Sequence, residues 1–510
     1  MPLDEFLDVV HDSGAARWSN WHQNFEQTPL YKFYDLWNAN PDISSLGGYK
    51  HTTRALQQIT VDALQQDRSV RALGGGWSFT PVAATDGIML NTRPLNYRFT
   101  LDADQIAPNY PGRGTLLFVQ CGISIAELNR FLASNNLALR TSGASNGQTI
   151  AGALSTGTHG AALAVGAVPE YVVAIHLVTG PGKTVWLERQ SYPVVQPSVV
   201  QALDATAKLN DDLFNAAVVS FGSFGIIHGV VIEVDRLYYL NAWRKRIPLD
   251  QKLWDAIARG DFSTVNLPGA NGRRPYHFQI VVNPYDQKPG AFATVMYREN
   301  APPRGSKPAD PFSRVAQGDG ALELIGRLTD FTGDITADLT NLLVKIGYGE
   351  YNNVSGIPGY IFSDTTTRGH AASSAMGMAL RDLQKAMAIA TDEVQKAQAP
   401  ALVAVRLVKS SQATLSFTCH GAVTGVLEID GPDSNRVRAA YRAVWQRLKQ
   451  ENITYTFHWG KLNNLDAPSV RAMYGPSLAK WSLARDALLP SRELRRLFAN
   501  DFVHQLELSD

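Results

Sequence analysis

The sequence predicts an α+β fold in two lobes, one built from small mixed sheets with helices and the other from an antiparallel sheet covered by helices. The chain has 510 residues, 45% of them hydrophobic, and it is too long to fold around a single core. Strands occur together with helices but without strict βαβ alternation, which argues against a doubly wound sheet. The character of the sequence changes near Arg236, from strand-rich and glycine-rich to more helical. We therefore expect a boundary near residue 235.

The first half contains strand and helix signals with well-marked ends. Ser124 and Glu127 are spaced as a capping box that starts a helix. The β-branched run Ile226–Val234 is typical of a buried strand, and Gly180-Pro181-Gly182 predicts the turn of a hairpin. The other predicted elements are strands at Thr115–Gln120, Tyr171–Thr179 and Thr184–Glu188 and a helix at Asp211–Val219.

The second half alternates predicted strands with two long helices. Apolar residues recur at helical spacing in Ala375–Gln398 and in Ser434–Gln450. The segment Ala301–Pro311, rich in proline and charge, predicts an exposed loop. Strands are predicted at Phe278–Val282, Ala293–Tyr297, Ala401–Val408, Ala413–Thr418 and Gly425–Ile429.

Composition excludes several classes of function. The net charge of +1 indicates neither a nucleic-acid partner nor an anionic membrane. Cys121 and Cys419 form no CxxC motif, a count that suits a reducing, cytoplasmic setting. The acidic N-terminus is unlike a signal peptide, and no apolar run is long enough for a membrane span. We expect a soluble protein.

The first string that carries chemistry is Gly74-Gly75-Gly76-Trp77-Ser78, which follows the strand-like Val70–Leu73. Consecutive glycines permit positive φ and leave a row of accessible N–H groups, a geometry that wraps an anion such as a pyrophosphate. The alternative is a tight turn without a ligand.

The second string, residues 142–160, is nearly all small and polar and has no helical or strand period. A surface linker could look like this, but Ile150, Ala153 and Leu154 indicate burial. A buried irregular segment needs partners for its backbone groups, and a polar cofactor supplies them. The fingerprint GxGxxG is absent from both strings, so a Rossmann fold is not indicated.

These two strings, in this order and spacing, resemble the FAD-binding half of the vanillyl-alcohol oxidase superfamily. The segment Phe457-His458-Trp459-Gly460-Lys461 is similar to the HWxK motif of its sugar-oxidising branch, which contains the alditol and aldonolactone (gulonolactone) oxidases. The resemblance implies an FAD-binding (PCMH-type) domain at 1–235, a substrate-binding domain at 236–450, and a C-terminal segment, 451–510, that returns to the flavin.

The resemblance also implies roles for individual residues. His458 and Lys461 would approach the pyrimidine edge of the flavin, where a fixed cation stabilises the negative charge of the reduced ring. Ile227 would meet the adenine end. The remaining residues of the FAD cradle would be Gly74, Gly75, Gly76, Trp77, Ser78, Gly143, Ala144, Ser145, Gly147, Thr149, Gly152, Thr156, Gly157 and His159.

Two positions depart from the family pattern. The branch commonly attaches its flavin to a histidine where Trp77 stands, so we expect FAD to be bound non-covalently. Alditol-type relatives have a Glu-x-Arg pair where this chain reads Ala404-Val405-Arg406, so the arginine is retained and the acid is missing. With Tyr348, Tyr351, Tyr360 and Phe362 near in sequence, a larger and less polar substrate is an open alternative.

Several histidines compete for the role of base. His159, His228, His370 and His420 are expected to be structural, whereas the motif places His458 by the flavin. Lys461 is the second candidate, because burial and a neighbouring cation would lower its pKa.

The predicted reaction is oxidation of a CH–OH group in a small substrate. Hydride would pass to FAD, His458 or Lys461 would take the hydroxyl proton, and Arg406 would orient the oxygen. Molecular oxygen would be the acceptor and give hydrogen peroxide. In the aldonolactone branch, glycine at the position aligned with Gly143 goes with oxidases and alanine with dehydrogenases; a register shift of one residue would place Ala144 there. The alternatives are a dehydrogenase, a natural-product tailoring oxidoreductase, or a ligand-binding protein without catalysis.

Overall fold

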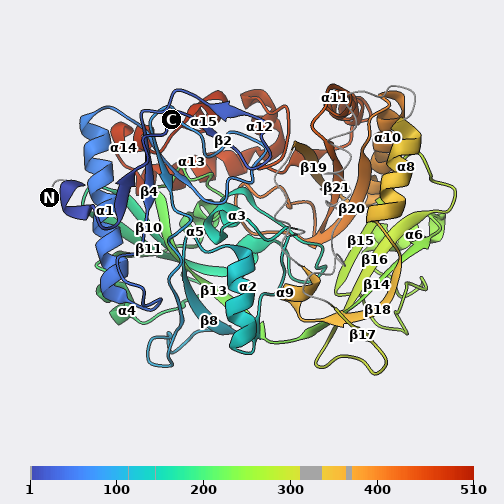
Figure 1. The fold of residues 1–510 in the computed structure, drawn as a ribbon, viewed down its shortest axis with the longest axis horizontal. Helices are drawn as coiled ribbons and strands as arrows, with labels where there is room; N and C mark the ends of the chain where they lie inside the picture. The colour runs from blue at the N-terminus through green and yellow to red at the C-terminus, as the bar shows by residue number, and fades with distance from the viewer. Residues whose placement is uncertain (1–2, 113, 144, 310–335, 363–369, 510) are drawn as a thin grey trace.

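A computed structural model describes residues 3–112, 114–143, 145–309, 336–362 and 370–509. Within these residues the strands form three main sheets and one two-stranded ribbon, β2 (Trp18–Ser19) with β3 (Glu26–Gln27). Figure 1 shows the first two sheets at one end of the molecule and the third at the other end. The mixed α+β architecture predicted from the sequence is therefore confirmed.

The two sheets of the first lobe are mixed. The four-stranded sheet has the order β1 (Val10–Asp12), β4 (Lys32–Leu36), β6 (Ile88–Asn91), β5 (Val70–Leu73). The second has the order β12 (Thr206–Leu209), β11 (Lys183–Glu188), β10 (Val172–Gly180), β13 (Ile226–Arg236), β8 (Thr115–Gln120), β7 (Arg98–Thr100), with β9 (Leu137–Ala138) also on β13.

Helices of the first lobe begin where the sequence predicts capping. Ser124 and Glu127 form the full capping box of α2 (Ile125–Ser134), and Thr149 caps α3 (Ile150–Thr156) by accepting a hydrogen bond from the Gly152 N–H. The predicted hairpin is confirmed, because β10 and β11 pair antiparallel. The remaining helices of this part are α1 (Leu46–Gln65), α4 (Pro197–Ala202) and α5 (Asp211–Ala217).

The third sheet forms the second lobe with helices packed against it. Its order is β17 (Lys307–Pro308), β18 (Tyr351–Gly356), β14 (Tyr239–Ile247), β16 (Ala291–Glu299), β15 (His277–Val282), β20 (Leu402–Lys409), β21 (Val423–Pro432), β19 (Ala371–Ala379), β22 (Tyr455–Phe457). Its helices are α6 (Gln251–Arg259), α8 (Thr336–Gly347), α9 (Pro358–Ile361), α10 (Leu383–Lys396) and α11 (Asn435–Gln450).

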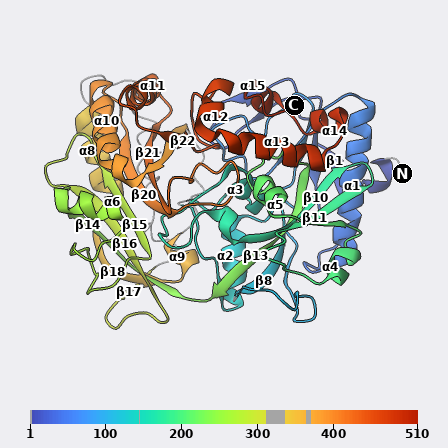
Figure 2. The same ribbon diagram turned by 180° about the vertical axis from the view of Figure 1, so that it is seen from behind.

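The chain then returns to the first lobe. The closing helices lie beside the N-terminal elements in both views (Figures 1 and 2), and Trp459, Val470 and Trp481 are buried in the core of the first lobe. These helices are α12 (Ala467–Tyr474), α13 (Pro476–Leu488), α14 (Arg492–Leu497) and α15 (Asp501–Gln505). None of the described helices is both long and apolar enough to cross a membrane.

Two secondary-structure predictions were wrong. Residues 375–379 of the predicted helix Ala375–Gln398 belong to strand β19, and the helix α10 begins only at Leu383. The strand lies between β21 and β22, and a side chain at Gly377 would lie 2.2 Å from the Phe417 carbonyl oxygen, so tertiary packing overrides the helix propensity of this alanine-rich run.

The second error is the strand predicted at Ala413–Thr418. This segment is irregular, and Leu415 and Phe417 are fully buried. Its backbone groups are satisfied outside any sheet, since the Thr414 N–H donates to Asn215 and the Trp459 indole donates to the Leu415 carbonyl. The predicted loop is mostly exposed over residues 301–309, although Lys307–Pro308 forms the short, exposed strand β17 and Ala309 is buried. Asp310 and Pro311 lie outside the described residues.

Candidate active site

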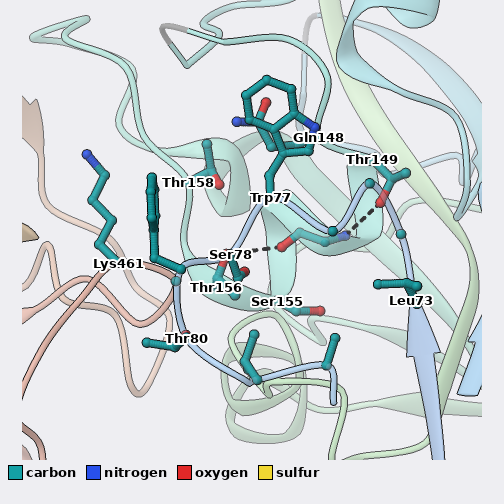
Figure 3. A pocket seen from close by; sticks show the side chains of 18 of the residues that line it. Leu73, Trp77, Ser78, Thr80, Gln148, Thr149, Ser155, Thr156, Thr158 and Lys461 are labelled. Atoms are coloured by element: carbon teal, nitrogen blue, oxygen red, sulfur yellow. Dashed lines mark hydrogen bonds between the residues drawn. The ribbon is translucent and has the colours of Figure 1, made fainter. Parts of the chain in front are cut away.

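A cavity of about 440 Å³ lies where the two lobes meet. One wall comes from the first lobe, with residues of both glycine strings and of the segment 221–227. The other wall comes from β19, β20 and β21 and from the segment 458–461. Figure 3 shows Lys461 on the side of the pocket opposite Thr149. The two glycine strings, Ile227 and the segment around His458 thus line one space.

The first string, Gly74–Ser78, directly follows β5 and lines the cavity. Among the described residues, none accepts a hydrogen bond from the five backbone N–H groups of this string. Gly76 has a φ of +68°, a conformation that favours glycine. A row of free N–H groups facing a cavity fits an anionic ligand.

The two strings are packed directly against each other. A Cβ atom at Gly74 would lie 2.0 Å from Thr149 Oγ1, one at Gly75 would lie 2.6 Å from the Gly147 carbonyl oxygen, and one at Gly147 would lie 2.3 Å from the Trp77 ring. Only glycine permits this approach, which brings the N–H groups of one string beside those of the other. The glycine-rich sequence therefore has a packing reason as well as a conformational one.

The second string also leaves polar atoms unsatisfied. Among the described residues, buried side-chain atoms of Ser142, Asn146 and Gln148 find no hydrogen-bond partner, and of these three residues Gln148 lines the cavity. Such atoms are costly unless a ligand or water completes them. With the free N–H groups of the first string, the unpaired amide oxygen of Gln148 makes the cavity suitable for a polar cofactor such as FAD.

Most of the predicted cradle residues line this cavity. Gly157 and Gly147 do not: Gly157 ends α3 in the left-handed conformation (φ +74°), and Gly147 packs against the Trp77 ring. Ala144 lies outside the described residues. The predicted residues that line the cavity are Gly74, Gly75, Gly76, Trp77, Ser78, Gly143, Ser145, Thr149, Gly152, Thr156, His159, Ile227, Arg406, His458 and Lys461.

Trp77 belongs to an aromatic group at the cavity wall. Its ring stacks on Trp21 at 5.3 Å between centroids, and the His22 ring is nearly perpendicular to it, with 5.4 Å between centroids. His22 itself stacks on Phe79 at 4.2 Å. The position at which the family resemblance implies an attachment histidine is therefore occupied by a packed indole.

A buried carboxylate joins the residues predicted to be catalytic. Glu428 on β21 is completely buried and lies 3.0 Å from Arg406 Nε, 2.9 Å from Lys461 Nζ and 3.3 Å from His159 Nε2. In the sheet register Glu428 is directly opposite Ala404. The acid that is missing at residue 404 thus has a counterpart on the neighbouring strand, which the sequence analysis missed.

The sequence did contain a signal for Glu428. The predicted strand Gly425–Ile429 reads Gly-Val-Leu-Glu-Ile, with a single acid inside an otherwise apolar run. A carboxylate in such a strand is almost never fully buried unless it is paired. The identity of its partners could not be read from the sequence, because they lie on other elements.

The pKa of Lys461 shifts in the direction opposite to the prediction. Burial and the Arg406 charge lower this pKa, but the negative charges of Glu428 and Asp430 outweigh them, and the net pKa is raised above its usual value. For Glu428, burial raises the pKa, yet the positive charges of Arg406 and Lys461 hold it well below its usual range. Both groups are therefore charged at neutral pH, and Lys461 is a cation rather than a base.

His458 is held as a neutral ring. Burial, together with the charges of His159 and Lys461, lowers its pKa well below the usual value. Its Nδ1 accepts a hydrogen bond from the Gly460 N–H at 3.0 Å, so a neutral imidazole carries its proton on Nε2. His458 is thus a hydrogen-bond donor on its free side.

The other histidines divide into two groups. His228 is buried, with its ring nitrogens within hydrogen-bond distance of Thr53 and Gln120, and His420 pairs with Thr456 on the strand β22, so both have the structural role expected. His159 and His370 line the cavity, and His159 also contacts Glu428.

The four aromatic residues considered for an apolar pocket do not line the cavity. Tyr348 and Phe362 are buried in small hydrophobic clusters, and Tyr360 is 42% exposed. Tyr351 lies under the Arg244 guanidinium at 4.9 Å. The residues around Lys461 are instead polar and charged.

Comparison with known proteins identifies the class to which this site belongs. Residues 49–188, which include both glycine strings, match the FAD binding domain family. The protein is therefore an FAD-dependent oxidoreductase whose residues 49–188 form an FAD binding domain. The predicted cofactor FAD is confirmed.

The relatives give this class more detail. The chain is 25% identical over 460 residues to L-gulono-1,4-lactone dehydrogenase of Mycobacterium tuberculosis, covering 88% of this chain and 93% of the relative. It is 30% identical over 197 residues to D-arabinono-1,4-lactone oxidase of Eremothecium gossypii, covering 38% of this chain and 33% of the relative. Cholesterol oxidase of Brevibacterium sterolicum has the same fold, with a TM-score of 0.69 at 14% identity over 98% of this chain and 97% of that one.

Proposed function

We propose that the protein oxidises a CH–OH group of a small polyhydroxylated molecule, of which a sugar lactone is the leading example. One observation carries this proposal: the cavity contains the buried charged group Arg406, Glu428 and Lys461, with Asp430 within 4.0 Å of Lys461. Charged side chains in a cavity match a substrate with many hydroxyl groups, because each hydroxyl can form a hydrogen bond with them. The names of the lactone-oxidising relatives support the same class.

Oxidation of CH–OH to a carbonyl releases a hydride, which passes to FAD, and a hydroxyl proton, which passes to water, because Lys461 is already protonated and His458 carries its hydrogen on Nε2. When bound, FAD supplies the hydride acceptor. Arg406 orients the substrate oxygen, and the two fixed cations Arg406 and Lys461 lower the energy of negative charge that develops on it. His458 donates a hydrogen bond through Nε2, and the row of N–H groups from Gly74 to Ser78 holds the anionic part of the cofactor.

The test is a substrate panel scored by the anaerobic loss of oxidised flavin absorbance in the purified holoenzyme. The panel contains sugar lactones, alditols, a sterol and an aromatic alcohol. We expect lactones or alditols to reduce the flavin and the apolar alcohols to leave it oxidised. Reduction by the sterol or the aromatic alcohol alone would contradict the proposal.

We propose molecular oxygen as the acceptor, with hydrogen peroxide as its product, since Gly143 lines the cavity without a side chain. The second candidate is a dehydrogenase, because the relative that covers most of this chain bears that name. Mixing the substrate-reduced enzyme with air-saturated buffer separates the two: rapid return of the oxidised spectrum together with hydrogen peroxide indicates an oxidase, and slow return indicates a dehydrogenase.

We further propose that FAD is bound without a covalent link, because the packed indole of Trp77 occupies the attachment position. Acid precipitation is expected to release free FAD into the supernatant and to leave a colourless pellet. A mass of the denatured chain raised by one FAD would show that another residue is attached to the cofactor.

A further inference from the structure

We propose that Glu428 is the positioning carboxylate of this active site. Although it lies on β21, it replaces the acidic residue that strand β20 lacks at Ala404. The residue lies outside every motif identified in the sequence, and the inference rests on the function proposed above. In this role Glu428 holds Arg406 and Lys461 in their working orientation toward the cavity.

The first support is the arrangement of the contacts. The two oxygens of Glu428 face different partners: Oε2 lies 3.0 Å from Arg406 Nε, and Oε1 lies 2.9 Å from Lys461 Nζ and 3.3 Å from His159 Nε2. These partners come from β20, from the segment after β22 and from the second glycine string. One carboxylate thereby connects three segments that are far apart in the sequence.

The second support is burial. Glu428 has no exposed surface, whereas the side chains of Arg406 and Lys461 retain 10% and 20% of theirs and line the cavity. All three residues line the cavity, but only the two cations keep surface that a substrate can contact. An unpaired buried charge costs several kcal/mol, so each partner depends on the others to remain ionised.

The third support is the sheet register. Ala404 and Glu428 are directly opposite each other in the antiparallel pair β20–β21, and so are Arg406 and Val426. Side chains of directly opposed residues lie on the same face of a sheet, with Cβ atoms about 4.5–5.5 Å apart. A carboxylate on either residue of the 404/428 pair therefore faces the same side as Arg406, two residues along β20.

Removing the charge of Glu428 changes the titration of Lys461. The charged or titratable groups around Lys461 are Glu428 and Asp430 on β21, Arg406 on β20, His458 on its own segment, and His22 and His159 from the first lobe. Without Glu428, burial and Arg406 remain and both lower the pKa of Lys461, with Asp430 the one opposing carboxylate among these groups. The ammonium would then lose its proton at a lower pH than in the parent enzyme.

The experiment compares Glu428→Gln with the parent holoenzyme by measuring the FAD midpoint potential against pH, with redox dyes and without substrate. Because a cation favours the reduced flavin, we expect the potential of the variant to fall below that of the parent as the pH rises through the lowered pKa of Lys461. Since no substrate is present, this result stands even if every lactone and alditol fails to reduce the enzyme. Parallel potential curves for the two proteins would overturn the proposal.

Two further variants separate positioning from folding. The double variant Glu428→Ala with Ala404→Glu moves the carboxylate across the strand pair. We expect its flavin to be reduced at least about tenfold faster than that of Glu428→Ala alone, which corresponds to about 1.4 kcal/mol in the barrier. Glu233→Gln removes another buried carboxylate, paired with Arg140 at 2.9 Å and away from the cavity. If Glu233→Gln changed the potential curve as Glu428→Gln does, or if the exchanged carboxylate restored folding but not the rate, Glu428 would be structural only.

Discussion

At the scale of single residues, the site is defined by which charges are buried together. Lys461 has an environment that favours the ammonium, since Glu428 lies 2.9 Å away and Asp430 4.0 Å away. His458 has an environment that favours the neutral ring. The sequence analysis considered both residues as alternative bases. The structure instead makes Lys461 a fixed cation and His458 a hydrogen-bond donor.

Replacing Lys461 by methionine removes the cation but keeps most of the bulk of the side chain. We expect FAD to remain bound and the rate of flavin reduction to fall by about 10²–10³, the usual effect of one electrostatic donor. Stopped-flow reduction under anaerobic conditions measures this rate directly. A reduction rate within about twofold of the parent would leave Lys461 as a packing residue only.

The substitution Gly143→Ala tests whether this position controls the access of oxygen to the flavin. It does not have a positive φ, and an added Cβ would lie 3.3 Å from the Thr158 methyl group, so alanine fits with a small adjustment. We expect Gly143→Ala to slow reoxidation by oxygen about tenfold or more, equivalent to about 1.4 kcal/mol, while flavin reduction is unchanged. The half-reactions are measured separately by stopped flow.

The matched control for this prediction is the double variant Gly143→Ala with Thr158→Ser, which removes the methyl group nearest to the new side chain. If the double variant regained the parent reoxidation rate, steric pressure on Thr158 rather than a blocked path would be responsible. Loss of both half-reactions together, or loss of FAD, would show that Gly143 is required for the backbone conformation of the second string.

At the scale of elements, the FAD cradle is an interface between two loops. Gly75 contacts the backbone of the second string, and Gly147 lies against the ring of Trp77, so neither string has its shape without the other. The helix α3 starts inside this interface, because its N-cap Thr149 is also the residue nearest to Gly74.

Gly147→Ala tests this interface. The new Cβ would lie 2.3 Å from the Trp77 ring, and overpacking of this kind costs about 1–3 kcal/mol. We expect FAD to bind about 5- to 150-fold more weakly, measured by equilibrium dialysis of the holoenzyme. The control is Gly47→Ala in α1, where a Cβ meets nothing within 4 Å. An equal loss of FAD in the control would contradict the interpretation.

At the scale of the whole molecule, stability is linked to pH through buried histidines. Burial lowers the pKa of His176 and His277 to about 3 and that of His22 to about 4, with nearby cations contributing at His277 and His22. In the unfolded chain histidine titrates near 6.5, so the unfolded state binds more protons between these values. Their contribution to stability is complete above about pH 6.5 and is lost as the pH falls toward 4 and 3.

The expected result is a urea-unfolding midpoint that decreases as the pH is lowered from 7 to 5, with each such histidine adding about 1.4 kcal/mol per pH unit. His176→Gln should reduce the pH dependence of the unfolding free energy by the share of one histidine, about 1.4 kcal/mol per pH unit. His11→Gln, at an exposed position in β1, should leave this dependence unchanged. A midpoint independent of pH over this range would show that the rings are accessible to protons in the folded state.

Local patterns predicted most of the first lobe. The capping box at Ser124 and the hairpin around Gly180-Pro181-Gly182 are specified by neighbouring residues, and both were placed correctly. The second lobe was less predictable, because Ala375–Ala379 is a strand only through pairing with β21 and β22. The division at residues 235 and 450 stays a prediction.

The sequence by itself determined the class of the protein and its cofactor, because the glycine strings and the motif around His458 are continuous runs whose chemistry is local. Only the tertiary structure decided the charge of Lys461, the hydrogen-bonding role of His458 and the place of the missing acid. Those properties depend on Glu428, which meets Arg406, Lys461 and His159 across large sequence separations. Electrostatic energy depends on the distance between charges and on their burial, and neither quantity exists until the chain has folded.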